Sequence, residues 1–310
     1  RARMEDPDGF HRALIHQLFV SFEYAHNFAV TTVEPGRTPW FYEASAGWAE
    51  WELFRKGSTS LHQQYFASMF NSAPQLALEQ PEGDLAPLAD EQHAVRAYIW
   101  PFFMQQEAGG SPQPIYDAWK ATDGVTSWPA FHAAIDAQRP FATSFQDFAV
   151  RNLNLDLGAA TSPGYHDLDP NFAPGSTPGL TYDLFLERPQ AADARALGGP
   201  GGPGLRPLSA EYDHVVVDPA SGIRTLSLDF GGLSPASGAG VTVLTQAHDG
   251  TWARRDVAPG SRLDLCFDNA GDEIDQLYVI VGNHQRMTDF DTPATSSLSG
   301  SYTVAAAAAC

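Results

Sequence analysis

Two segments near the beginning of the chain carry residue types that can hold a metal ion. The segment LIHQLFVSFEYAH, residues 14–26, contains His16, and the segment WFYEASAGWAEWELF, residues 40–54, contains Glu43. An imidazole and a carboxylate are both common zinc ligands. The chemistry that they could serve together is hydrolysis of a peptide bond by a metal-bound water molecule.

That chemistry needs two more groups on the first helix. A histidine four residues after His16 would lie on the same helix face and share the metal, and a glutamate directly after His16 would act as general base. In this chain the first position holds Val20 and the second holds Gln17. An isopropyl group cannot bind zinc, and a carboxamide cannot accept a proton near neutral pH. We therefore expect no catalytic residue here, and no metal at His16, Val20 and Glu43.

No neighbouring residue is placed to replace the missing zinc ligand. His26 lies ten residues after His16, about 15 Å along a continuous helix, and His11 points about 140° away around it. Glu23 and Glu50 each lie two turns from the expected ligand positions, which is about 10 Å. A ligand from a distant part of the chain is the alternative, and in that case the chain would be an active metal-dependent peptidase that binds zinc.

Four segments of the chain resemble one family when they are taken together. HQLFVSFEYAH is similar to the pattern HExFHAxQxxY, and the segment at 40–54 is similar to WxxEGxAxWxE. Residues 93–121 resemble a later helix pair, and FATSFQDFAVRNLN, residues 141–154, resembles a closing helix with an F-x-x-F-A pattern. On these residues the chain resembles the secreted bacterial gluzincin-type zinc metallopeptidases, as a degenerate member.

The resemblance implies roles for the residues of the lost site. His16, Val20 and Glu43 would be relics of the ligand positions, Gln17 a relic of the base position, and His16 would contact Glu43. Such peptidases build part of their cleft from a β-sheet ahead of the motif helix, whereas 15 residues precede His16. We expect this upstream sheet to be absent or removed by processing. The apolar helix face left behind would need a protein partner or a second copy of the chain.

The elements that must position these residues are expected to fall into two domains. Apolar residues at three- and four-residue steps predict a helical, metallopeptidase-like domain over residues 1–157. Its expected helices cover residues 14–22, 40–54, 61–70, 93–106, 115–121, 128–137 and 141–152. Pro101 should kink its helix or begin a new one. Residues 158–180 are rich in Gly, Pro, Ser and Asp, and they predict a linker.

The remainder of the chain, residues 181–310, predicts an all-β domain. Short segments of alternating polarity, separated by turn residues, are typical of a β-sandwich. These segments cover residues 180–187, 213–218, 223–230, 240–247, 251–257, 261–267, 276–283 and 301–306. The glycine-rich stretch at 198–204 predicts a surface loop. The fold class is therefore expected to be α+β.

Composition narrows the classes of partner and compartment. The formal net charge is −19, so nucleic acid is not an expected partner. No run of about 18 apolar residues predicts a membrane span. The chain begins Arg1-Ala2-Arg3, as expected of a processed, secreted protein. Cys266 and Cys310 predict one extracellular disulfide, with two separate thiols as the alternative.

These observations together predict an exported bacterial pseudo-metallopeptidase. It would act outside the cell by binding a protein partner or by assembling with itself, without a cofactor. The alternative is an active peptidase that binds zinc through an atypical ligand set.

Overall fold

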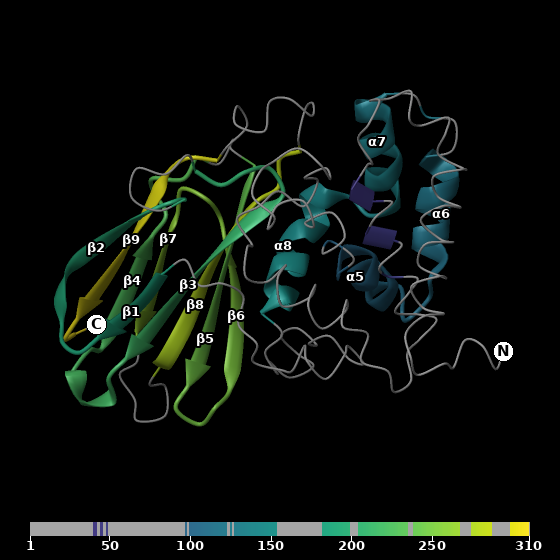
Figure 1. Cartoon of the computed structure of the whole chain (residues 1–310). Coiled ribbons are helices and arrows are strands. Elements are labelled where there is room, and N and C mark those ends of the chain that lie inside the picture. Colours follow the sequence, from purple (N-terminus) through teal and green to yellow (C-terminus); the bar gives the residue numbers. More distant parts are fainter. Residues whose placement is uncertain are drawn as a thin grey trace, which may run out of the picture.

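The computed structural model describes part of the chain. The described residues are 40, 41, 44, 45, 48, 97, 99–122, 125, 127–153, 182–198, 204–234, 238–266, 274–286 and 298–309. They contain four complete helices and nine strands in two sheets, so the α+β class is confirmed (Figure 1). Among these residues no helix is long and apolar enough to cross a membrane.

The four helices coincide with four of those predicted from apolar periodicity. They are α5 (Ile99–Glu107), α6 (Gln113–Thr122), α7 (Trp128–Gln138) and α8 (Phe141–Asn152). Pro101 lies in the first turn of α5, where its missing N–H has no partner within the helix to lose. The helix α5 begins at Ile99, two residues before the proline, and it continues past Pro101 to Glu107. Gly109 and Gly110 follow with φ of 66° and 88°, a conformation that ends a helix at little cost in glycine.

The helices enclose an aromatic core that also includes residues from the predicted helix at 40–54. Trp40, Phe41, Ala44, Ser45 and Trp48 are helical and buried, and their spacing places them on one face of a helix. In this core the Trp48 indole donates to Gln105 Oε1 at 2.8 Å, and the Trp119 indole donates to Ser45 Oγ at 3.0 Å. The segment around residue 44 is thereby held against α5 and α6.

The strands form a β-sandwich, and β8 and β9 pair between strands that precede them in the chain. They are β1 (Tyr182–Leu186), β2 (Gln190–Ala196), β3 (Ser209–Val217), β4 (Thr225–Asp229), β5 (Ala239–Ala247), β6 (Trp252–Val257), β7 (Arg262–Cys266), β8 (Ile274–Asn283) and β9 (Ser301–Ala307). A short 3-10 turn, Pro219–Ser221, connects β3 and β4. Sheet A has the order β1-β3-β8-β5-β6, and sheet B has the order β2-β9-β4-β7. The β1–β3 pairing is parallel, and the other described pairings are antiparallel.

Sheet A is covered on both faces. Its inner face packs on sheet B through a core of aliphatic side chains that includes Val215, Val243 and Val279. Its outer face packs against α8, where Ala149 and Leu153 lie in one buried cluster with side chains of β3, β5 and β8. Figure 1 shows α8 lying between the sandwich and the other three helices. The helical and β parts therefore share an interface, and their independence as two domains stays a prediction.

Candidate functional site

The predicted relic of a zinc site lies outside the described residues. This applies to His16, Gln17, Val20 and Glu43, and therefore also to the expected contact between His16 and Glu43. Among the residues that the structure describes, no group of three or more His, Cys, Asp and Glu side chains could hold a metal ion. The loss of the zinc site accordingly stays a prediction from the sequence.

The predicted disulfide is described at one end. Cys266 is the last residue of β7, whereas Cys310 lies outside the described residues. In sheet B, Thr225 of β4 pairs with Cys266 on one side and with Ala307 of β9 on the other. The Thr225 hydroxyl also donates to the carbonyl oxygen of Ala309 at 2.9 Å. This register directs the chain after β9 toward the end of β7, which favours the predicted pairing without testing it.

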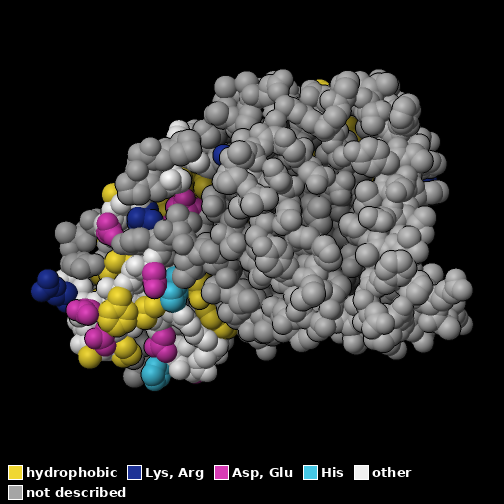
Figure 2. Space-filling view, in the orientation of Figure 1, with side chains coloured by type: hydrophobic (Ala, Val, Ile, Leu, Met, Phe, Trp, Pro, Cys, Tyr) yellow, Lys and Arg dark blue, Asp and Glu magenta, His cyan; other side chains and the backbone are white. Residues whose placement is uncertain are grey.

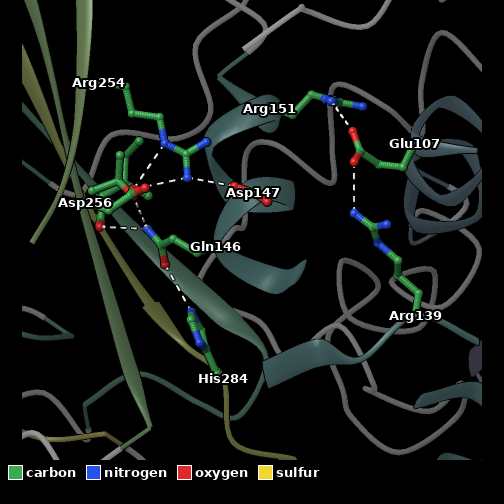
Figure 3. A network of polar contacts seen from close by, with 10 residues as sticks. Glu107, Arg139, Gln146, Asp147, Arg151, Arg254, Asp256 and His284 are labelled. Atoms are coloured by element: carbon green, nitrogen blue, oxygen red, sulfur yellow. Dashed lines mark hydrogen bonds and ion pairs between the residues drawn. The ribbon is translucent and has the colours of Figure 1, made fainter. Parts of the chain in front are cut away.

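The structure brings a different set of polar side chains together where α8 meets sheet A. We call these the junction cluster: Gln146 of α8, Thr242 of β5, Asp256 of β6 and His284, which follows β8 (Figure 3). Gln146 Nε2 donates to Thr242 Oγ1 at 3.1 Å, and Thr242 Oγ1 donates to Asp256 Oδ1 at 2.7 Å. His284 Nε2 lies 3.2 Å from Gln146 Oε1. Helix α8, the neighbouring strands β5 and β6, and the segment after β8 thus meet in one chain of hydrogen bonds.

The surroundings fix the orientation of the Gln146 amide. Its nitrogen also donates to the carbonyl oxygen of Ile280 at 3.2 Å, and a carbonyl oxygen can only accept. The amide oxygen therefore faces His284, and it accepts a hydrogen bond when the imidazole carries its proton on Nε2. Burial lowers the pKa of His284, which favours the neutral imidazole near neutral pH.

Two glycines form the recess that receives these groups. Gly240 of β5 and Gly282 of β8 are direct partners in the strand register. A Cβ atom on Gly240 would lie 2.3 Å from His284 Nε2, and one on Gly282 would lie 2.6 Å from Gln146 Oε1. Any other residue at either position would push the amide or the imidazole away. The glycines are therefore a condition for the junction cluster to form.

Ion pairs surround the cluster and hold α8 to its neighbours (Figure 3). Arg254 of β6 contacts Asp147 of α8 at 2.6 Å and Asp256 at 3.0 Å. On the other side of α8, Arg151 pairs with Glu107 of α5. Figure 3 shows these pairs on opposite sides of the helix that carries Gln146. They restrain α8 in the position that the hydrogen bonds of Gln146 require.

A second polar group lies inside the sandwich, between the two sheets. We call it the sandwich cluster: Glu211 and Asp213 of β3, Arg195 of β2 and Tyr302 of β9. Both carboxyl side chains are 1% exposed, and as residues i and i+2 they point to the same face of the sheet. Tyr302 donates to Asp213 Oδ2, and the Arg195 guanidinium lies 3.8 Å from Asp213 Oδ1. The Gly198 N–H donates to Glu211 Oε2 at 2.7 Å.

Burial makes the sandwich cluster sensitive to pH. Burial, together with the neighbouring Asp213 carboxylate, raises the pKa of Glu211 to about 7. Burial also raises the pKa of Asp213. Two carboxyl groups this close cannot both ionise easily in a medium of low dielectric constant. The pair therefore shares a proton below neutral pH, and the buried arginine balances the charge that remains.

Sequence reasoning did not single out either cluster, although each leaves a trace in the sequence. Gly240 and Gly282 interrupt apolar strands, and a glycine inside a strand often marks the close approach of another group. Glu211 and Asp213 occupy alternate positions of a strand whose neighbouring positions are apolar. That pattern can also describe a strand with one solvent-exposed face, so it could not reveal that the acids point inward.

The chain was compared with protein-family models, with curated proteins and with solved structures, and it matches none of them.

Proposed function

We propose that the chain is an exported, non-catalytic protein derived from a gluzincin-type peptidase, and that it assembles with a second copy through edge strand β1. The sequence supports the non-catalytic part, because Gln17 and Val20 replace the base and one ligand. The observation that carries the assembly part is the character of β1. This strand pairs with β3 on one side and is an edge among the described strands.

The other sheet edges carry more features that discourage pairing than β1, in which the one charged residue, Asp183, forms a pair with His214 of β3. Strand β6 exposes Arg255 among its charged residues, β7 exposes the pair Arg262 and Asp264, and the register of β2 is irregular between Gln190 and Asp193. Charges and bulges of this kind keep sheet edges from joining. In contrast, β1 reads YDLFL. Its fourth residue, the aromatic Phe185, is 56% exposed.

A second copy is the occupant that this edge fits best. Two identical edge strands related by a twofold axis can pair with each other, because the same surface patch is then presented by both chains. Figure 2 shows hydrophobic side chains beside Asp, Glu and His on the visible part of the sandwich. An apolar strand edge flanked by polar groups is typical of an interaction surface.

The assembly part is tested by measuring mass in solution as a function of concentration. Wild-type protein should pass from monomer to dimer as concentration rises, in light scattering or analytical ultracentrifugation. Phe185→Ser should shift this transition to at least tenfold higher concentration. Tyr116→Ser is the matched control, since Tyr116 is 50% exposed on α6 and is not part of the proposed surface. A wild-type protein that stays monomeric at all accessible concentrations would contradict the assembly.

The non-catalytic part is tested by metal analysis together with casein hydrolysis, each with and without chelator. We expect no bound zinc and no chelator-sensitive hydrolysis. The double variant Gln17→Glu with Val20→His should gain zinc binding, because it restores a base and a second imidazole one turn from the first. Stoichiometric zinc in the wild-type protein, with hydrolysis that a chelator abolishes, would instead support the peptidase alternative.

A further inference from the structure

The junction cluster contains the groups that an acyl transfer reaction needs. A hydroxyl nucleophile must donate a hydrogen bond to a base, and the Thr242 hydroxyl donates to the Asp256 carboxylate at 2.7 Å. A carbonyl group must accept a hydrogen bond where negative charge develops, and Gln146 Oε1 faces the His284 N–H at 3.2 Å. The side-chain amide of Gln146 is the acyl group between them.

The distances place nucleophile and acyl group side by side. Thr242 Oγ1 lies 3.1 Å from Gln146 Nε2, and Nε2 is bonded directly to the amide carbon, Cδ. Thr242 is fully buried, and Gln146 is 9% exposed. Because Nε2 donates to Oγ1, the hydroxyl lies in the plane of the amide, and attack requires the Gln146 side chain to rotate so that the face of its carbonyl carbon turns toward Oγ1. Burial also keeps out the water that would compete with the hydroxyl for the same carbon.

We propose that Thr242 and Gln146 react with each other after folding and form an ester bond that joins strand β5 to helix α8. The bond links Thr242 Oγ1 to Gln146 Cδ, and the amide nitrogen leaves as ammonia. Atoms and electrons balance without an oxidant or a second substrate. The product is an intramolecular crosslink between two side chains that a hydrogen bond joins in the unreacted chain.

Asp256 and His284 can carry out the proton transfer and the charge stabilisation that this reaction requires. Asp256 accepts the hydroxyl proton as Oγ1 attacks Cδ, and His284 stabilises the oxyanion through its Nε2–H. The proton on Asp256 then passes to the amide nitrogen as the C–N bond breaks and ammonia departs. The Asp256 side chain is 63% exposed, so ammonia can leave along this side chain toward solvent, whereas the carbon under attack belongs to the buried Gln146. Asp256 and His284 are therefore the catalytic residues of the proposed step.

The fold around the cluster supports a reaction that happens once in each molecule. The carbonyl oxygen of Ile280 holds the amide nitrogen, and Arg254 holds the base at 3.0 Å. The recess at Gly240 and Gly282 holds the amide oxygen against the imidazole. No turnover is needed, so a slow step suffices, and the ester would be protected by the same burial that allowed it to form.

The test is the intact mass of the purified full-length protein, followed over time at several pH values from about 6 to 9. The reacted chain should be lighter than the sequence requires by about 17 Da, the mass of the ammonia released. Digestion after arginine under denaturing conditions should then join the peptide that contains Gln146 to residues 225–254. Hydroxylamine, which cleaves esters and leaves amides intact, should separate the two peptides.

Two variants assign the loss of mass to the proposed step. Thr242→Val removes the nucleophile at nearly constant shape and should keep the full mass. Asp256→Asn keeps a hydrogen-bond acceptor beside the hydroxyl and removes the base, so the mass should fall at least a hundredfold more slowly. Circular dichroism checks that both variants are folded. A wild-type protein that is folded and retains its full mass under all these conditions would overturn the proposal, as would an equal loss of mass in Thr242→Val.

Discussion

The junction cluster and the sandwich cluster are two solutions to the same problem, which is how to bury polar side chains. At the junction, uncharged Gln146 and Thr242 are buried, and the charges of Asp256 and Arg254 remain at the rim. Inside the sandwich, two carboxyl groups are themselves buried and share one arginine. In the first arrangement the buried side chains are uncharged, and they are satisfied by hydrogen bonds. The second depends on a proton.

This difference indicates which kind of substitution, a change of size or a change of charge, should destabilise each cluster most. A buried neutral network is sensitive to shape, because every donor and acceptor must stay within about 3 Å of its partner. A buried acidic pair is sensitive to charge, because removing its cation or its proton leaves a carboxylate that water cannot reach. Changes of size should therefore disturb the junction most, and changes of charge should disturb the sandwich most.

The largest effect is expected when the cation of the sandwich cluster is removed. Arg195→Met should lower the free energy of unfolding by about 3–5 kcal/mol at pH 8, because both buried carboxyl groups then lack a counter-charge. The loss should be smaller at pH 5, where the pair holds a proton. Urea denaturation at the two pH values measures it. Arg262→Met is the matched control, because its pair with Asp264 is exposed and should contribute about 0–1 kcal/mol.

The second largest effect concerns the proton that Glu211 holds in the folded chain. The pKa of Glu211 is raised from its ordinary value of 4.5 to about 7, so between these values the folded chain holds a proton that the unfolded chain has released. The stabilisation from this group is complete below pH 4.5 and is lost as pH rises through 7. The change in the free energy of unfolding should be about 3 kcal/mol.

Glu211→Gln removes this titration and should flatten the dependence of stability on pH by that amount. Glu187→Gln is the control for the loss of one carboxylate, since Glu187 is exposed directly after β1. Chemical denaturation at half-unit steps from about pH 4 to 8 gives both profiles. If the wild-type protein and Glu211→Gln respond to pH in the same way, the proposed buried proton does not exist.

A smaller effect is expected when the junction is changed in size and not in charge. Gly240→Ala should cost about 1–3 kcal/mol, because the new methyl group displaces the His284 imidazole or the Gln146 amide. Gly250→Ala is a useful comparison. Its Cβ would meet open space, and its φ of 83° adds backbone strain alone. Ring proton signals of His284 in an NMR spectrum should shift in the first variant and stay unchanged in the second.

Local pattern was sufficient to predict many elements from the sequence. Helix α8 begins and ends where the apolar spacing of FATSFQDFAVRN places it, directly after Pro140. Strand β2 was missed, because QAADARA is rich in alanine and contains no β-branched or aromatic residue. It is a strand because it pairs with β9, more than a hundred residues later in the chain. Tertiary pairing thus overrides a weak local preference.

The two clusters could not be predicted for a related reason. Gln146 and Thr242 are separated by 96 positions, and Gln146 and His284 by 138. No periodicity in a single segment can indicate contacts over such separations. Whether Glu211 points toward a core or toward solvent depends on which sheet covers β3, and the alternation within β3 does not contain that information.

The position of β9 between β2 and β4 governs when the β part can become complete. During synthesis, β2 has no neighbour on the β9 side, and β4 cannot be joined to it, until residues 301–307 have left the ribosome. Tyr302 arrives with the same strand, so the acids of β3 also lack one of their hydrogen-bond donors until that moment. Because sheet B is complete only when β9 lies between β2 and β4, the β part stays incompletely folded, with unpaired strand edges, until residues 301–307 are available.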